Sequence, residues 1–236
     1  MVSINPAVCI QDDGRLAYQI PLDIKLNAAA TFDNFVSTHN EQLVSLLQSA
    51  EPYVYFWASD SVGKSHLLQA TCQKYTKAIY LPLSDFELWQ PEIFSGLEHY
   101  DLICLDDVAS IAGQPLWEQA LFNLFNRVRD EQKLLRISGN VAATQLPVGL
   151  KDLASRLSWG VSIQVQTLSD DEKILALSTR AQQKGFNLSD DVAAYLLKNC
   201  PRDMQSLFTI LEQLDDASMQ AQRRITIPFI KKCLNL

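Results

Sequence analysis

The segment that most constrains this chain is ASDSVGKS, which occupies residues 58–65. It follows the apolar run YVYFW (53–57) and precedes a stretch, from about 64 to 75, that is predicted to be helical. Apart from Ala58 in place of a first glycine, it matches the phosphate-binding loop pattern G-x-x-x-x-G-K-[ST]. A loop of this kind between a strand and a helix predicts a nucleotide site in an α/β fold. The alternative is a chance Gly-Lys-Ser at the start of a helix.

The chemistry of such a loop assigns roles to its residues. Consecutive backbone N–H groups and the N-terminus of the following helix converge on phosphate oxygens. Gly63 permits close approach of the backbone, Lys64 reaches the β- and γ-phosphates, and Ser65 offers its hydroxyl to Mg²⁺. Ala58 fits the tight turn out of the strand as long as its φ stays negative. The predicted nucleotide-binding residues of the loop are Ser61, Val62, Gly63, Lys64, Ser65 and His66.

A second motif, LICLDD (102–107), reads as a buried strand that ends in two carboxylates. After a phosphate-binding loop, Asp106 is predicted to orient Mg²⁺ through water, and Asp107 to polarise the water that attacks the γ-phosphate. Glu is commoner than Asp at this second place and is one methylene longer, so we expect any hydrolysis to be slow. Taken alone, the motif also fits a strand end with an Asp turn.

The remaining pattern defines the fold class. Further short apolar runs alternate with amphipathic helical segments, as in a parallel sheet covered on both faces; the runs are AIYLPL (78–83), LLRIS (134–138) and VSIQV (161–165). After residue 167 only helices are predicted, and the first begins at a capping box, Ser169 to Glu172. We predict an extended leader over 1–27, an αβα sandwich with a five-stranded parallel sheet over 28–166, and a small all-helical lid over 167–236.

Composition excludes several functions. The five cysteines among the 236 residues are scattered and never form C-x-x-C, which argues against a zinc site or disulfide framework and fits a reducing cytoplasm. A net charge of −7 disfavours a protein whose main task is to grip phosphate backbones. No apolar run approaches the roughly 20 residues that cross a bilayer, so no membrane partner is expected.

With these motifs in order, the chain resembles the AAA+ ATPase family, and more closely its DnaA initiator branch. TFDNFVSTHN (31–40) resembles the segment that touches the adenine, which implies nucleotide contacts for Phe32, Phe35 and Val36. LLRISGN (134–140) places Asn140 where the family has its catalytic sensor-1 residue. Without the resemblance, Asn140 reads as a turn former at the end of a strand.

The same resemblance implies functional roles for two arginines. LASRLSWG (153–160) is similar to box VII of the family, with Arg156 as the arginine finger that enters a neighbouring subunit's nucleotide site. PRDMQSLF (201–208) is similar to the sensor-2 helix, with Arg202 reaching from the lid to the phosphates. In isolation, Arg156 and Arg202 read as solvated surface charges.

The leader contains the segment QIPLDI (19–24), which resembles the motif by which bacterial proteins dock on the sliding clamp. In that mode an extended peptide places Gln19 in polar contacts, and apolar side chains fill pockets of the clamp; the apolar anchors are Ile20, Leu22 and Ile24. The alternative is an ordinary first strand or linker.

The resemblance implies a bacterial, cytoplasmic, replisome-associated regulator that binds ADP (or ATP) with Mg²⁺. Such a regulator docks on the clamp and stimulates hydrolysis of ATP held by DnaA, which prevents re-initiation. The resemblance implies a weak ATPase activity of its own and allows a homo-oligomer. Direct DNA contact is not expected, since the chain ends after the lid and only 42 positions separate Lys64 from Asp106. The alternatives are a helicase loader or other replication ATPase of the superfamily, and a P-loop kinase for a small molecule.

Overall fold

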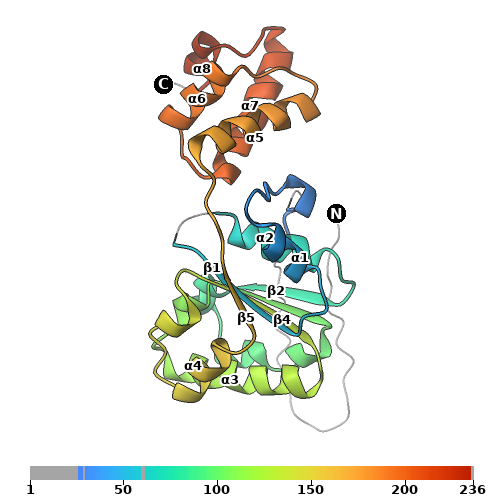
Figure 1. The fold of residues 1–236 in the computed structure, drawn as a ribbon, viewed down its shortest axis with the longest axis vertical. Coiled ribbons are helices and arrows are strands. Elements are labelled where there is room, and N and C mark those ends of the chain that lie inside the picture. The colour runs from blue at the N-terminus through green and yellow to red at the C-terminus, as the bar shows by residue number, and fades with distance from the viewer. Residues whose placement is uncertain (1–25, 29, 60–61, 235–236) are drawn as a thin grey trace. The chain divides into compact units, whose positions relative to one another are not determined.

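The computed structural model describes residues 26–28, 30–59 and 62–234 (Figure 1). The predicted clamp-docking residues, Gln19 to Ile24, and Ser61 of the loop lie outside this part of the chain. The chain divides into two compact units, the first consisting of residues up to 59 together with 64–165 and the second chiefly of 166–234. No helix among the described residues is long and apolar enough to cross a membrane.

The first unit alternates strands and helices along the chain. Its elements are α1 (Glu41–Leu47), β1 (Tyr53–Trp57), α2 (Lys64–Cys72), β2 (Ala78–Pro82), β3 (Leu102–Asp106), α3 (Pro115–Asp130), β4 (Leu134–Gly139), α4 (Lys151–Leu157) and β5 (Val161–Gln164). Short 3-10 helices occupy the connections: η1 (Phe32–Asn34), η2 (Leu83–Leu88), η3 (Pro91–Phe94), η4 (Leu97–His99), η5 (Val108–Ile111) and η6 (Ala143–Gln145).

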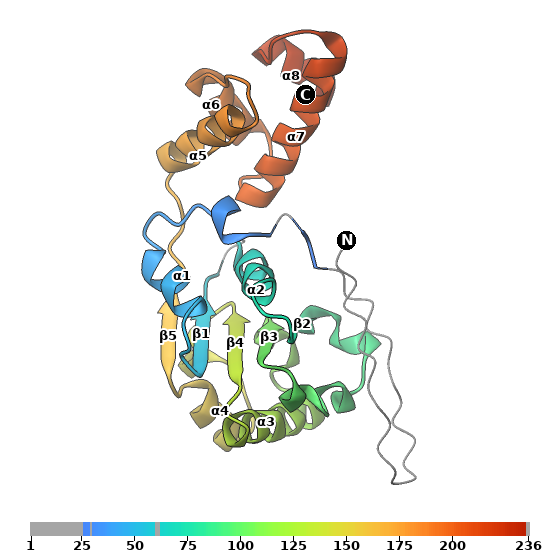
Figure 2. The same cartoon turned by 90° about the vertical axis from the view of Figure 1, so that its right-hand side faces the viewer.

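The five strands form one sheet in the order β2-β3-β4-β1-β5, and every neighbouring pair is parallel. Figure 2 shows β5, β1, β4 and β3 side by side. Helices α1 and α2 cover one side of the sheet, and α3 and α4 cover the other (Figure 1). The predicted αβα sandwich with a five-stranded parallel sheet is therefore confirmed.

Side chains alternate between the two faces of the sheet because successive residues of a strand point to opposite sides. In β3, Ile103 and Leu105 join a buried cluster with Leu121 and Phe125 of α3. Asp106, which follows Leu105 and points to the opposite face, is also buried. The face that α2 covers therefore carries polar groups inside the fold, next to the phosphate-binding loop.

The second unit contains four helices around a separate apolar core; they are α5 (Asp170–Gln183), α6 (Asp190–Asn199), α7 (Met204–Ala221) and α8 (Ile227–Leu234). The predicted capping box at Ser169 is present, with Glu172 bonding back to the Ser169 N–H. Helix α7 begins two residues after Arg202. The helix begins at Met204 because the Asp203 side chain accepts the Ser206 N–H at 2.8 Å and caps it.

Candidate functional site

The phosphate-binding loop connects β1 to α2, which begins at Lys64. Gly63 has φ of 90°, a left-handed conformation that glycine adopts without strain, whereas Ala58 does not adopt a positive φ. The Ala58 N–H donates to the Gly139 carbonyl at 3.3 Å, and Lys64 Nζ donates to the Ala58 carbonyl at 2.8 Å. The lysine thus joins the two ends of the loop, and alanine is accommodated at its first position.

The segment predicted to touch the adenine is attached to α2. His66 Nε2 donates to the Thr31 carbonyl at 2.7 Å, and its ring lies 6.0 Å from that of Phe35. Lys74 Nζ lies 5.2 Å above the centre of the Phe32 ring. Burial lowers the pKa of His66, and the bond to Thr31 opposes that shift. Phe32, Phe35 and the half-buried Val36 therefore lie on a segment fixed to the helix that follows the loop.

Asp106 lies at the end of β3 and is only 6% exposed. The Tyr80 hydroxyl donates to its Oδ2 at 2.6 Å, and the Ser138 hydroxyl donates to its Oδ1 at 2.5 Å. Burial raises the pKa of Tyr80, the Asp106 carboxylate raises it further, and hydrogen bonding to Gln69 and Ser65 acts in the opposite direction. The pKa of this hydroxyl therefore responds to both predicted Mg²⁺ ligands, Ser65 and Asp106.

These donors fit a magnesium ion. A serine hydroxyl and an aspartate carboxylate are hard oxygen ligands, and Mg²⁺ commonly takes one or two protein groups together with waters and substrate phosphates. Among the described residues no group of three or more His, Cys, Asp or Glu side chains is arranged to hold a metal. The site is therefore suited to an ion that arrives with a nucleotide.

Asp107 has a left-handed backbone, with φ of 56°. Its N–H donates to Ser138 Oγ at 2.9 Å, and the Ser110 hydroxyl donates to its carboxylate at 2.8 Å. Asn140 is exposed and lies one residue beyond β4. The structure thus places Ser138, which the sequence analysis did not select, against both carboxylate residues. The catalytic role of Asn140 stays a prediction.

Arg156 lies on α4, and its side chain is partly buried. Within the described part of the chain the guanidinium has no hydrogen-bond or ion-pair partner. The start of its helix is held by Glu118 of α3, which is 3% exposed and accepts from the N–H groups of Gly149 and Leu150 at 3.1 and 2.8 Å. Sequence reasoning missed Glu118 because an acid in the first turn of an amphipathic helix usually faces solvent.

Arg202, the predicted lid contact to the phosphates, is paired within the second unit. Its guanidinium donates to both carboxylate oxygens of Asp170, at the start of α5, and lowers the pKa of that carboxyl. Both side chains are exposed. The contact of Arg202 with a nucleotide stays a prediction.

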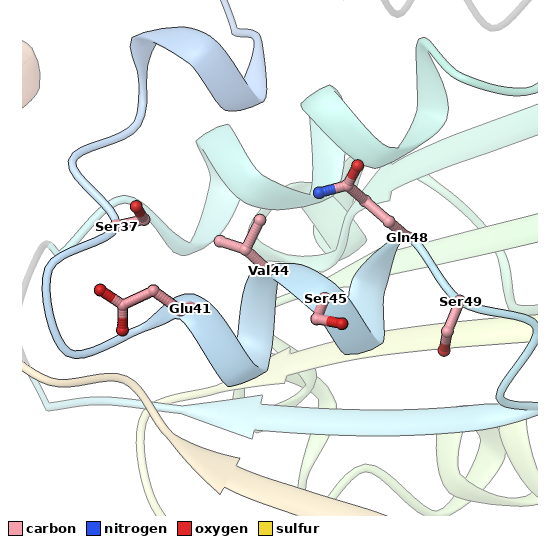
Figure 3. Close-up of a pocket in the computed structure, with 6 residues that line it drawn as sticks. All are labelled: Ser37, Glu41, Val44, Ser45, Gln48 and Ser49. Carbon is pink, nitrogen blue, oxygen red and sulfur yellow. The ribbon is translucent and has the colours of Figure 1, made fainter.

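A cavity of about 550 Å³ lies on α1 and its flanks. Figure 3 shows its lining residues, which are Ser37, Glu41, Val44, Ser45, Gln48 and Ser49. None of the predicted nucleotide-binding residues lines it.

Comparison with known proteins found a family match for the second unit and structures of similar fold for most of the chain. Residues 170–234 match the family model described as "Hda, lid domain". Domain III of the replication initiation protein DnaA from Thermotoga maritima is 16% identical, with a TM-score of 0.71 over 90% of this chain and 98% of that one. AMPPCP-bound DnaA from Aquifex aeolicus is 21% identical, with a TM-score of 0.64 over 80% of this chain and 67% of that one.

The Holliday junction branch migration motor RuvB from Thermotoga maritima has the same fold, at 14% identity and a TM-score of 0.65, over 87% of this chain and 71% of that one. At such identities the likeness to solved structures establishes the fold alone. The match to the lid family adds a relationship in sequence over the second unit. The chain therefore has the fold of DnaA domain III, and its second unit matches the lid domain of the Hda family.

Proposed function

We propose that this protein is a nucleotide-bound regulator of replication that docks on the DNA sliding clamp and stimulates hydrolysis of ATP held by DnaA. The observation that carries the proposal is the position of Arg156. Its helix, α4, lies on the opposite side of the sheet from α2, which begins the protein's own phosphate-binding site (Figure 1). An unpaired guanidinium on that side is suited to serve a nucleotide bound by another subunit.

The finger acts by electrostatics. A guanidinium at the transferring phosphate compensates the charge that spreads over its oxygens, an effect worth about 10³–10⁵ in rate in other arginine-finger systems. Arg156 acts in trans, because it needs a second AAA+ subunit with a bound triphosphate. The likeness of this fold to DnaA supports DnaA as the second subunit.

The protein's own nucleotide maintains the structure of the regulator. Two of the similar DnaA structures contain AMPPCP, which supports a nucleotide at the equivalent loop here. ADP would be held by Gly63, Lys64 and Ser65, with Phe32, Phe35 and Val36 near the base. Asp106 and Ser65 would hold Mg²⁺, which neutralises phosphate charge. Fast turnover is not required, in keeping with the shorter carboxylate of Asp107.

Docking on the clamp is assigned to Gln19, Ile20, Leu22 and Ile24. These residues lie outside the described part of the chain, so this step rests on the sequence motif. It brings the regulator to DNA through the clamp, in keeping with a net charge of −7.

The test follows ATP bound to purified DnaA in the presence of ADP and clamp loaded on DNA. We compare the intact protein with its Arg156→Ala, Gln19→Ala and Arg129→Ala forms; Arg129 is an exposed arginine paired only locally with Asp130. The proposal requires fast conversion of ATP to ADP with the intact protein and the Arg129 variant, and slow conversion with the other two. If the intact protein leaves DnaA-bound ATP untouched, the proposal is wrong and helicase loading becomes the leading function.

A further inference from the structure

We infer that Tyr80 and Ser138 are positioning residues that hold Asp106 in the orientation in which it receives Mg²⁺. The inference rests on the proposed nucleotide site and adds two residues to it. Neither belongs to the motifs from which the site was predicted.

The three side chains come from three neighbouring strands. Tyr80 lies on β2, Asp106 ends β3 and Ser138 lies on β4, and these strands are adjacent in the sheet. Tyr80 pairs in register with Cys104, two residues before Asp106, so the tyrosine and the aspartate lie on the same face. The parallel sheet therefore brings a hydroxyl to each side of the carboxylate.

The two hydrogen bonds fix the carboxylate. Tyr80 Oη lies 2.6 Å from Oδ2 and Ser138 Oγ lies 2.5 Å from Oδ1. With one donor on each oxygen, the group cannot rotate about its Cβ–Cγ bond without losing both bonds. An ionised carboxylate has about four lone-pair sites, so each oxygen retains one for a water ligand of a metal.

Both hydrogen bonds lie inside the fold. Asp106 is 6% exposed, Tyr80 is 8% and Ser138 is 0% exposed. Transfer of an ionised carboxylate out of water is costly unless hydrogen bonds compensate it, and hydroxyl donors to a carboxylate give strong bonds. The two hydroxyls are thus the hydrogen-bond partners that a carboxylate at this depth requires.

Tyr80 is also sensitive to both predicted Mg²⁺ ligands. Its hydroxyl donates to Asp106, and Ser65, at the start of α2, lowers the pKa of that hydroxyl. Residues that orient metal ligands in this way commonly contribute 10–100-fold to metal affinity. A purely structural pair of hydroxyls would affect the stability of the fold and leave the magnesium requirement unchanged.

The test measures ADP affinity by calorimetry, first in EDTA and then over a Mg²⁺ titration, for the full chain and its variants. Tyr80→Phe keeps the ring and removes the hydroxyl, Ser138→Ala removes the other donor, and Tyr100→Phe removes a hydroxyl from a half-buried tyrosine elsewhere in the unit. We expect the Tyr80 and Ser138 variants to bind ADP normally in EDTA and to need about 10–100-fold more Mg²⁺ for the tighter binding. The Tyr100 variant should match the wild type.

The outcomes separate the two proposals. If the Tyr80 and Ser138 variants respond to Mg²⁺ at wild-type concentrations, or if wild-type affinity does not respond to Mg²⁺, the positioning role is overturned and the nucleotide site stands. If the wild type binds no ADP under any condition, the nucleotide site itself is overturned and the inference fails with it.

Discussion

The carboxylate of Glu118, on α3, accepts a hydrogen bond at 2.8 Å from the backbone N–H of Leu150, the residue just before α4. The same carboxylate accepts from Gly149 at 3.1 Å and from Gly113 at 2.7 Å. One buried side chain therefore ties the loop that follows β3 to the first turn of the helix that carries Arg156. The direction of the proposed finger depends on a residue of another helix.

Replacement of Glu118 by alanine is expected to lower the free energy of unfolding by about 2–5 kcal/mol, because it removes the acceptor of three N–H groups. Urea unfolding measures the loss. Glu131→Ala, at an exposed acid near the end of the same helix, is the control and should change stability by less than about 0.5 kcal/mol. Equal losses of unfolding free energy in the Glu118 and Glu131 variants would contradict the structural role of Glu118.

Replacement of Arg156 by lysine is expected to restore little of the stimulation of DnaA-bound ATP hydrolysis. Lysine keeps the charge but lacks the planar group with five donors that spans two phosphate oxygens. Single-turnover hydrolysis measures the rate, with intact protein and Arg156→Ala as the two limits. A lysine variant as fast as the intact protein would show that charge alone is needed.

Acidification is expected to weaken the contribution of His66 to stability. Its pKa is lowered in the folded protein, so the unfolded chain binds the proton more tightly. The contribution is thus complete above the unfolded pKa of about 6.5 and falls as the pH drops from there toward the folded pKa.

The measurement compares the urea midpoints of wild type and His66→Gln at pH 7.5 and pH 5.5. Glutamine can still donate to the Thr31 carbonyl but does not titrate, so the difference between the two proteins isolates the histidine. Wild type should lose more stability than the variant over this range. An equal loss would contradict the burial of His66.

Gly139 has no room for a side chain. A Cβ there would lie 2.0 Å from Tyr55 Oη and 2.9 Å from Cζ, and that hydroxyl donates to the Val141 carbonyl at 2.6 Å. Gly139→Ala should therefore destabilise the fold by about 1–3 kcal/mol. The loss should be smaller in a Tyr55→Phe background, where the nearest atom is gone. Additive losses in the double variant, measured by thermal unfolding, would show that the methyl group is accommodated in another way.

The sequence predicted the parts of this fold that local patterns encode. Apolar runs bounded by polar turns identified the five strands, and the loop motif placed Lys64 at the start of a helix. Tyr80 and Ser138 were missed because their approach to Asp106 depends on the register of three parallel strands, which no local pattern records. Glu118 was missed for a related reason, since its partners Gly149 and Leu150 lie about thirty positions later in the chain.

The position of β1 in the sheet has a consequence for synthesis of the chain. Its two neighbours are β4 and β5, which begin at Leu134 and Val161, far behind Tyr53 in the order of translation. While the ribosome makes the intervening segments, the strand that leads into the phosphate-binding loop has both edges open, and such long-range parallel pairing is slow and exposed to aggregation. The loop acquires its final shape only on a nearly finished domain. Nucleotide binding is therefore expected only after β4 and β5 have been synthesised.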